Sequence, residues 1–211
     1  MRSARLDTDL TAKARIRDAA MSLIAADGVA GTSVRGVAEA AGVSPGLVIH
    51  HFGSKEGLRR AVDEAVVERF MLALREVPIE GSGRELVTKR GELIAGLMRS
   101  QPTLGDYIGR VFSEGTEMSS ELFHLMFVAS SADEALTRAG ALRTDSDAFW
   151  RAVQQMLLIV GPLMLRPLIE RELGSSLLAD QHIERWMRAN TDLLTRGLYA
   201  PPPSQRKRRS G

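Results

Sequence analysis

Apolar residues recur at helical spacing along most of the chain, and turn residues separate the periodic segments. The first such segment runs from Thr11 to Asp27 and is followed by Gly28. Its apolar stripe consists of Ile16, Ala19, Ala20, Leu23 and Ile24. Because positions three and four apart share one face of an α-helix, this pattern predicts an amphipathic helix that ends at Gly28. No alternating strand pattern of useful length occurs, so the sequence predicts an all-α fold.

The stretch from Thr32 to Gly42 predicts a second, short helix. Its apolar face consists of Val34, Val37, Ala38 and Ala41. We expect the Thr32 hydroxyl to cap the start of this helix, since a side-chain oxygen there can accept from a free backbone N–H group. Gly42 is expected to end it, because glycine adopts the left-handed conformation without steric cost.

A third helix is predicted directly after Gly42. Ser44 is its expected cap and Pro45 occupies the favoured first position, while Val48 and Phe52 point inward. Two helices joined by so tight a turn are typical of a helix-turn-helix, whose second helix enters the major groove of DNA. The alternative is a helical hairpin inside an ordinary bundle, in which the glycine and proline serve only as caps.

The remaining chain continues the helical pattern as far as Tyr199. Breaks are expected at Gly53-Ser54, at Pro78 with the glycines that follow, and at Gly161-Pro162 and Pro167. The expected helices cover residues 54–75, 84–100, 102–113, 117–140, 145–173 and 180–199. Residues 1–10 are polar and residues 200–211 combine three prolines with a basic run, so we expect both ends to be disordered.

The residues of the second and third helices resemble a known family. V-R-G-V-A-E-A-A-G-V-S-P-G, followed by H-H-F-G-S-K-E-G-L, is similar to the signature of the TetR/AcrR family of bacterial transcriptional regulators. The resemblance implies a helix-turn-helix DNA-binding domain over residues 11–60 and a helical effector-binding and dimerisation domain over 61–199. One departure is that Ile49 and His50 stand where the family usually has Tyr before its His-Phe pair, so the phosphate contact of that Tyr lacks its usual residue.

The resemblance also implies a set of DNA contacts. Arg35 is the position from which a guanine edge can be reached, and arginine is the commonest reader of that base. Lys55 and His51 are expected to contact phosphates, and Leu47 and Ile49 to face thymine methyl groups. The full predicted DNA-binding set is Thr32, Arg35, Ser44, Gly46, Leu47, Ile49, His50, His51 and Lys55. The alternative for Arg35 is a surface salt bridge to Glu39.

Composition narrows the possible functions. The chain has 211 residues and no cysteine, which excludes disulfides and thiolate chemistry and favours a cytoplasmic location. Residues 1–60 carry nine Lys and Arg against six Asp and Glu, whereas residues 61–199 carry fifteen against twenty. A basic head and an acidic body agree with DNA binding at one end. Neither a catalytic triad, a metal site nor a cofactor motif is predicted, and the longest apolar run is too short to span a membrane.

The second domain offers candidates for two further sites. A largely apolar effector pocket is predicted from Met98, Tyr107, Phe112, Phe123, Met126, Phe127, Trp150 and Met156, although each is individually a plausible core residue. A homodimer interface, in which two helices of each copy form a four-helix bundle, is predicted from Val153, Leu157, Val160, Met164, Ile183, Trp186 and Leu194.

These observations together predict a homodimeric transcriptional regulator that binds a palindromic operator. We expect a repressor that a small apolar or amphipathic effector releases from double-stranded DNA. The alternative function is a DNA-binding dimer of the same fold without a small-molecule switch, controlled by protein partners or acting architecturally. No membrane association is expected.

Overall fold

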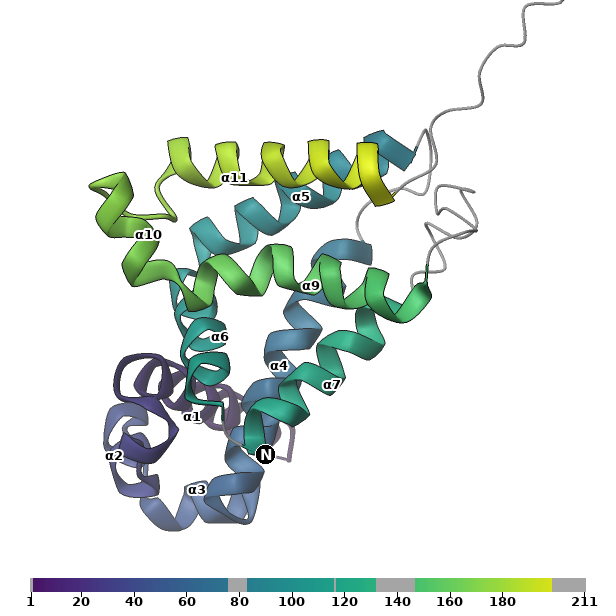
Figure 1. Cartoon of the computed structure of the whole chain (residues 1–211). Coiled ribbons are helices and arrows are strands. Elements are labelled where there is room, and N and C mark those ends of the chain that lie inside the picture. The colour runs from purple at the N-terminus through teal and green to yellow at the C-terminus, as the bar shows by residue number, and fades with distance from the viewer. Residues whose placement is uncertain (1, 76–82, 116, 132–146, 199–211) are drawn as a thin grey trace, which may run out of the picture.

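The computed structural model describes residues 2–75, 83–115, 117–131 and 147–198, and over these ranges every regular element is a helix (Figure 1). The helices are α1 (Arg2–Gly31), α2 (Val34–Ala41), α3 (Pro45–Phe52), α4 (Lys55–Arg75), α5 (Gly83–Ser100), α6 (Pro102–Glu114), α7 (Glu117–Ser131), α9 (Ala148–Met164), α10 (Arg166–Leu173) and α11 (Asp180–Leu193), and a π-helical turn (Leu194–Leu198) follows α11. The all-α prediction is confirmed. The predicted basic tail, the loop after Pro78 and the second half of the helix predicted over 117–140 lie outside the described residues.

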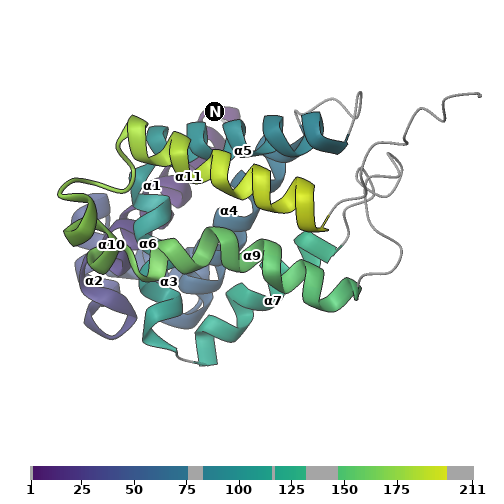
Figure 2. The ribbon, with the colours of Figure 1, turned by 45° about the horizontal axis from the view of Figure 1, so that its top comes forward.

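The helices form two groups, which we call the head and the body. The head consists of α1, α2, α3 and the first turns of α4, up to residue 60, and the body is the rest. In Figure 1 the head occupies the lower part, and α4 runs from it up into the body beside α7. Helix α6 packs against α1 of the head and against α9 of the body, while α11 lies along α5 (Figure 2).

One apolar core runs through both groups. Ile16, Val37 and Val48 of the head and Val62, Tyr107 and Ile183 of the body belong to the same buried cluster. All of these side chains are less than 2% exposed. The head therefore does not have a core separate from that of the body, and a change in the packing of one group reaches the other through shared side chains.

Two helix boundaries differ from the predictions. Helix α1 begins at Arg2, so residues 2–10 extend the first helix instead of forming a disordered arm. Helix α9 continues through Gly161-Pro162 and stops at Leu165, where α10 turns away by 68° with Pro167 in its first turn. A proline in the first turn of a helix loses no hydrogen bond, which explains why the break falls before Pro167 and not at Pro162.

A membrane crossing needs a helix that is both long and apolar. Among the described helices no single one meets both requirements, and only the bent pair α9–α10 passes when its two members are taken together.

Candidate DNA-binding surface

The turn between α2 and α3 forms through local backbone and capping bonds. Gly42 has φ 64° and ψ 41°, the left-handed conformation expected at the end of α2. Its N–H donates to the Glu39 carbonyl at 3.1 Å, and the N–H of Val43 donates to the Ala38 carbonyl at 2.9 Å. Carbonyls that a helix end leaves free are thereby satisfied, and three residues are enough to connect α2 to α3.

The start of α3 also follows the prediction. The Ser44 hydroxyl accepts from the N–H of Leu47 at 3.2 Å, with Pro45 in the first turn. Val48 is fully buried and holds the helix against the head, while Ile49 on the next position is 43% exposed. The exposed side of α3 therefore carries no Asp, Glu, Lys or Arg, and its apolar Ile49 is available for contact with another surface.

Helix α4 is packed closely against the end of α3, a relationship that sequence reasoning missed. A Cβ on Gly57 would lie 2.1 Å from the carbonyl oxygen of Phe52, so only glycine allows this approach. Ser54 caps α4 by accepting from the Gly57 N–H at 3.0 Å. Backbone and Ser54 hydrogen bonds lower the pKa of Glu56, the acidic residue in this first turn. In the sequence, Gly57 directly after Lys55 and Glu56 was the one residue that could have indicated this close approach.

Most of the predicted DNA-binding residues are accessible at the surface of the head. Those exposed to solvent are Arg35, Ser44, Gly46, Ile49 and His50, and those half-buried are Leu47, His51 and Lys55. Arg35 and Lys55 are thus both accessible to a polyanion. Among the described residues Arg35 makes no ion pair with Glu39, which removes the salt-bridge alternative for this conformation.

Thr32 is the exception. It is 6% exposed, and its hydroxyl donates to the Gly28 carbonyl at 2.8 Å. The cap of α2 is Ser33, whose hydroxyl accepts from the Gly36 N–H at 3.0 Å. The prediction that Thr32 caps the helix is therefore wrong, and its hydroxyl points inward and not toward a DNA phosphate. The error is one residue, and it arose because Thr and Ser are both good caps and stand side by side.

Two hydrogen bonds made by side chains of α6 hold the end of α1, just before α2. Gly28 leaves the helical conformation at φ 78°, which frees backbone groups on both sides of the break. The Glu114 carboxylate accepts from the Val29 N–H at 3.2 Å, and the Arg110 guanidinium donates to the Ala26 carbonyl at 2.6 Å. These contacts join residues more than eighty positions apart, so no local pattern could have indicated them.

A buried polar cluster links α4 to α6. The Arg59 guanidinium pairs with the Asp63 carboxylate at 2.9 Å, and the Tyr107 hydroxyl donates to the same carboxylate at 2.6 Å. All three side chains are at most 3% exposed. Burial raises the pKa of Asp63 to about 6, against the lowering effect of the Tyr107 hydrogen bond and the Arg59 charge. Burial and the neighbouring carboxylate also raise the pKa of Tyr107.

The predicted effector residues differ in how deeply they are buried. Met98, Tyr107 and Met156 are core residues, while Phe112 and Met126 are half-buried against that core. Phe123, Phe127 and Phe149 form a chain of ring contacts with Trp150, whose side chain is 59% exposed. Phe123 and Trp150 are thus exposed on the described part of the chain, and their place in a largely apolar effector pocket stays a prediction.

The predicted dimer residues divide between the two faces of α9 and α11. Val153, Val160 and Ile183 are buried in the core of the chain itself, so their assignment to an interface is wrong. Leu157 is 54% and Met164 36% exposed. Trp186 and Leu194 are half-buried. An evenly apolar helix does not reveal which of its faces packs inward, and this is why the sequence mixed the two sets.

The arrangement defines a class of protein, a helix-turn-helix DNA-binding regulator with a helical body. Residues 16–62 match the family described as bacterial regulatory proteins, tetR family. The HTH-type transcriptional regulatory protein RaaS of Mycobacterium tuberculosis is 38% identical over 164 residues, which cover 76% of this chain and 71% of the relative. The chain therefore belongs to the TetR family and is a DNA-binding transcriptional regulator.

Two further similarities extend this result. The HTH-type transcriptional repressor KstR2 of Rhodococcus jostii is 30% identical over 141 residues, 67% of this chain and 62% of its own length. A solved structure described as "Molecular basis for control of antibiotic production by a bacterial hormones" superimposes with a TM-score of 0.60 at 27% identity, covering 89% of this chain and 97% of that one.

Proposed function

We propose that this regulator is a homodimeric repressor that leaves its operator when a small effector binds the body. The observation that carries the proposal is the course of α4. Its first residue, Lys55, is one of the proposed phosphate contacts, and two turns later Asp63 accepts a hydrogen bond from Tyr107 of the body. A rearrangement of the body around Tyr107 would therefore move the helix on which α3 rests.

The DNA contacts belong to this proposal. We propose that α3 enters the major groove with Gly46, Leu47, Ile49 and His50 toward the bases. Arg35 reaches a base edge, and Lys55 contacts a phosphate as a point charge. Since the exposed side of α3 has no Arg, Asn or Gln, hydrogen-bonded readout is sparse, and DNA shape supplies part of the specificity.

The dimer brings two such heads to one operator. Leu157 of α9 and Leu193 of α11 are large apolar side chains on the surface of the chain. Burying them against a second copy would form the intersubunit bundle and place two recognition helices about 34–36 Å apart, one turn of DNA. An effector that changes this separation weakens binding to a palindrome more than to a single half-site.

Repression and effector release draw support from the relatives. KstR2 is a repressor by name, and the structural neighbour is described in terms of control by a bacterial hormone. The test is to recover the genomic DNA fragments that the purified protein binds, to sequence them, and to titrate the best fragment with a panel of apolar and amphipathic metabolites. We expect a palindromic consensus, and at least one compound that raises both the protein's melting temperature and the Kd for DNA. Compounds that stabilise the protein without changing DNA affinity would favour the unswitched alternative.

A further inference from the structure

A groove lies where the head meets the body, and no predicted site residue lines it except Met164. It is bounded by α1, by α6 and by the junction of α9 with α10, and its volume is about 510 Å³. Ser22, Thr103, Asp106 and Arg110 contribute polar groups, and Ala25 and Leu163 are among the apolar ones. A volume of this size fits a small organic ligand, and mixed walls are typical of sites for amphipathic molecules.

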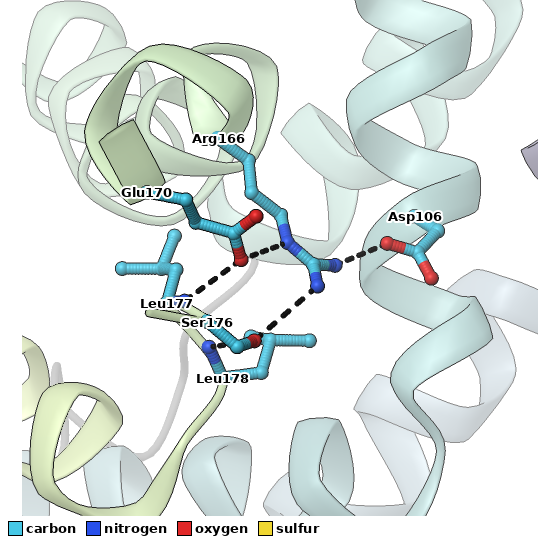
Figure 3. Close-up of polar contacts among 6 residues, drawn as sticks. All are labelled: Asp106, Arg166, Glu170, Ser176, Leu177 and Leu178. Atoms are coloured by element: carbon cyan, nitrogen blue, oxygen red, sulfur yellow. Dashed lines mark hydrogen bonds and ion pairs between the residues drawn. The ribbon is translucent and has the colours of Figure 1, made fainter. Parts of the chain in front are cut away.

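Ion pairs and hydrogen bonds of Arg166 hold the wall formed by α10 in position. Figure 3 shows the Arg166 guanidinium between Asp106 of α6 and Glu170 of α10, with Ser176 as a third partner. Glu170 also accepts from the Leu177 N–H at 2.8 Å. Burial alone would raise the pKa of Glu170, but the bonds from Arg166 and Leu177 outweigh it and lower that pKa. The carboxylate therefore stays charged, and the wall is held before any ligand arrives.

The floor of the groove is rigid for a different reason. Helices α6 and α9 approach so closely that a Cβ on Gly109 would lie 2.5 Å from the Leu163 carbonyl oxygen. Because backbone stands against backbone there, the floor cannot collapse into the groove by a change of rotamer. The wall formed by α10 and the floor are thus formed in the absence of a ligand.

Arg110 contributes a positive charge to the groove, in addition to the ion pair of Asp106 with Arg166. Its side chain is exposed, and its described partner is the neutral carbonyl of Ala26. The acids one turn before and after it are engaged elsewhere: Asp106 pairs with Arg166, and Glu114 accepts from the Val29 N–H. A guanidinium has five donors in a planar fork that matches a carboxylate, so an anion would be a stronger partner for it than one carbonyl.

We propose that this groove is a binding site for a small amphipathic monocarboxylate, with Arg110 as the anchor of the carboxylate and Ala25 and Leu163 against its apolar part. The site is separate from the effector site proposed within the body. A bound carboxylate competes with the Ala26 carbonyl for the guanidinium. Ala26 precedes the break at Gly28, so occupancy acts on the end of α1 that leads into α2.

The test uses hexanoate as the probe and hexanamide as its uncharged counterpart, at constant ionic strength with the full chain. Binding is followed by two-dimensional amide NMR. We expect hexanoate to shift the amides of residues 22–29 and 103–113 in a saturable way, with hexanamide at least tenfold weaker, because the charge-assisted bonds are lost. Arg110→Gln should weaken hexanoate at least tenfold. Arg188→Gln, an exposed arginine on α11 away from the groove, should not.

A second variant separates loss of the anchor from a change in fold. Ser22 is exposed on α1, and Ser22→Phe would fill the groove while leaving Arg110 in place. We expect it to abolish hexanoate binding with an otherwise unchanged amide spectrum. Hexanoate binding that survives both Arg110→Gln and Ser22→Phe, shifts confined to other residues, or equal affinity for hexanamide would each overturn the proposal.

Discussion

The indole N–H of Trp186 donates to the carbonyl of Leu158 at 3.0 Å, and this is the carbonyl that Pro162 leaves without its helical partner. Proline has no N–H group, so the residue four positions before it in a helix keeps a free carbonyl. The Asn190 side chain donates to the same oxygen at 3.1 Å. The carbonyl that Pro162 leaves free in α9 is therefore satisfied by two side chains of α11. These hydrogen bonds join the two helices next to Leu157, which belongs to the proposed dimer interface.

Because Trp186 and Asn190 donate to the same carbonyl, we predict that either one alone can satisfy it. Trp186→Phe or Asn190→Leu alone should cost about 0.5–1.5 kcal/mol in hydrogen bonding, because one donor remains. The double variant leaves a carbonyl with no donor and should cost about 1–3 kcal/mol more than the sum of the singles. Urea unfolding of the four proteins measures this coupling. In a Pro162→Ala background the helix supplies its own N–H, so the coupling should shrink; if it is unchanged, Pro162 is not its cause.

Asp63 predicts a specific dependence of stability on pH. The folded chain raises its pKa from 3.8 to about 6, so the folded state binds the proton more tightly than the unfolded state does. The stabilisation from this group is therefore fully present below pH 3.8 and is lost as the pH rises through about 6. Wild type should gain about 2 kcal/mol relative to Asp63→Asn between pH 7 and pH 4.5, since one pKa unit is worth about 1.4 kcal/mol.

Chemical unfolding of the two proteins at matched pH gives this difference, in which the titration of all other carboxylates cancels. Glu121→Gln, close enough to raise the Asp63 pKa by its charge, is a useful control. It should move the midpoint of the wild-type curve to lower pH. A constant stability difference between wild type and Asp63→Asn from pH 7 to pH 4.5 would mean that the buried carboxylate is held ionised by Arg59.

The sequence predicted best what is decided locally. The Gly42 turn, the Ser44 cap and the first-turn proline of α3 depend on neighbouring residues, and all three form as expected. The recognition of the family rested on the same stretch. What the sequence could not supply was the partner of each exposed or buried group: Glu114 meets Val29, and Tyr107 meets Asp63, only after the chain has folded.

In the body, more than in the head, the sequence did not show which apolar residues would be buried. On α9, Val160 and Leu157 are three positions apart and equally apolar, yet one is 4% and the other 54% exposed. Periodicity identifies apolar positions but not the element that will cover them. A pocket predicted from residue type met the same difficulty, because a large aromatic residue such as Trp150 suits a core, a pocket or an interface equally well.

The exposed leucines predict which substitutions prevent dimerisation. Leu157→Asp combined with Leu193→Asp places two charges where we propose the second copy packs, on side chains 54% and 57% exposed. Light scattering should give twice the 23.0 kDa chain mass for wild type and the single mass for this variant. Leu72→Asp, at a side chain 51% exposed on α4, is the matched control and should stay dimeric. A monomeric wild type at micromolar concentration would remove both the dimer and the palindromic operator.

Arg35 and Lys55 predict two different kinds of loss in DNA binding. Arg35, exposed on α2, is proposed to reach a base edge, so Arg35→Ala should cost about 1–3 kcal/mol on the best operator and little on random DNA. Lys55, half-buried at the start of α4, is proposed to contact phosphate. Lys55→Ala should therefore weaken operator and random DNA alike. It should also lower the salt dependence by about one counterion per contact, hence about two per dimer.

The two variants are compared on the recovered operator and on a scrambled fragment over a series of salt concentrations. Both must keep wild-type helicity and mass, which their positions at the surface of the head allow. Glu39→Ala, one turn after Arg35, serves as the control for a change on the same helix. If Arg35→Ala weakens all sequences equally, the arginine only holds phosphate. Readout would then come from His50, from the apolar contacts of Leu47 and Ile49 with thymine methyl groups, and from the shape of the DNA.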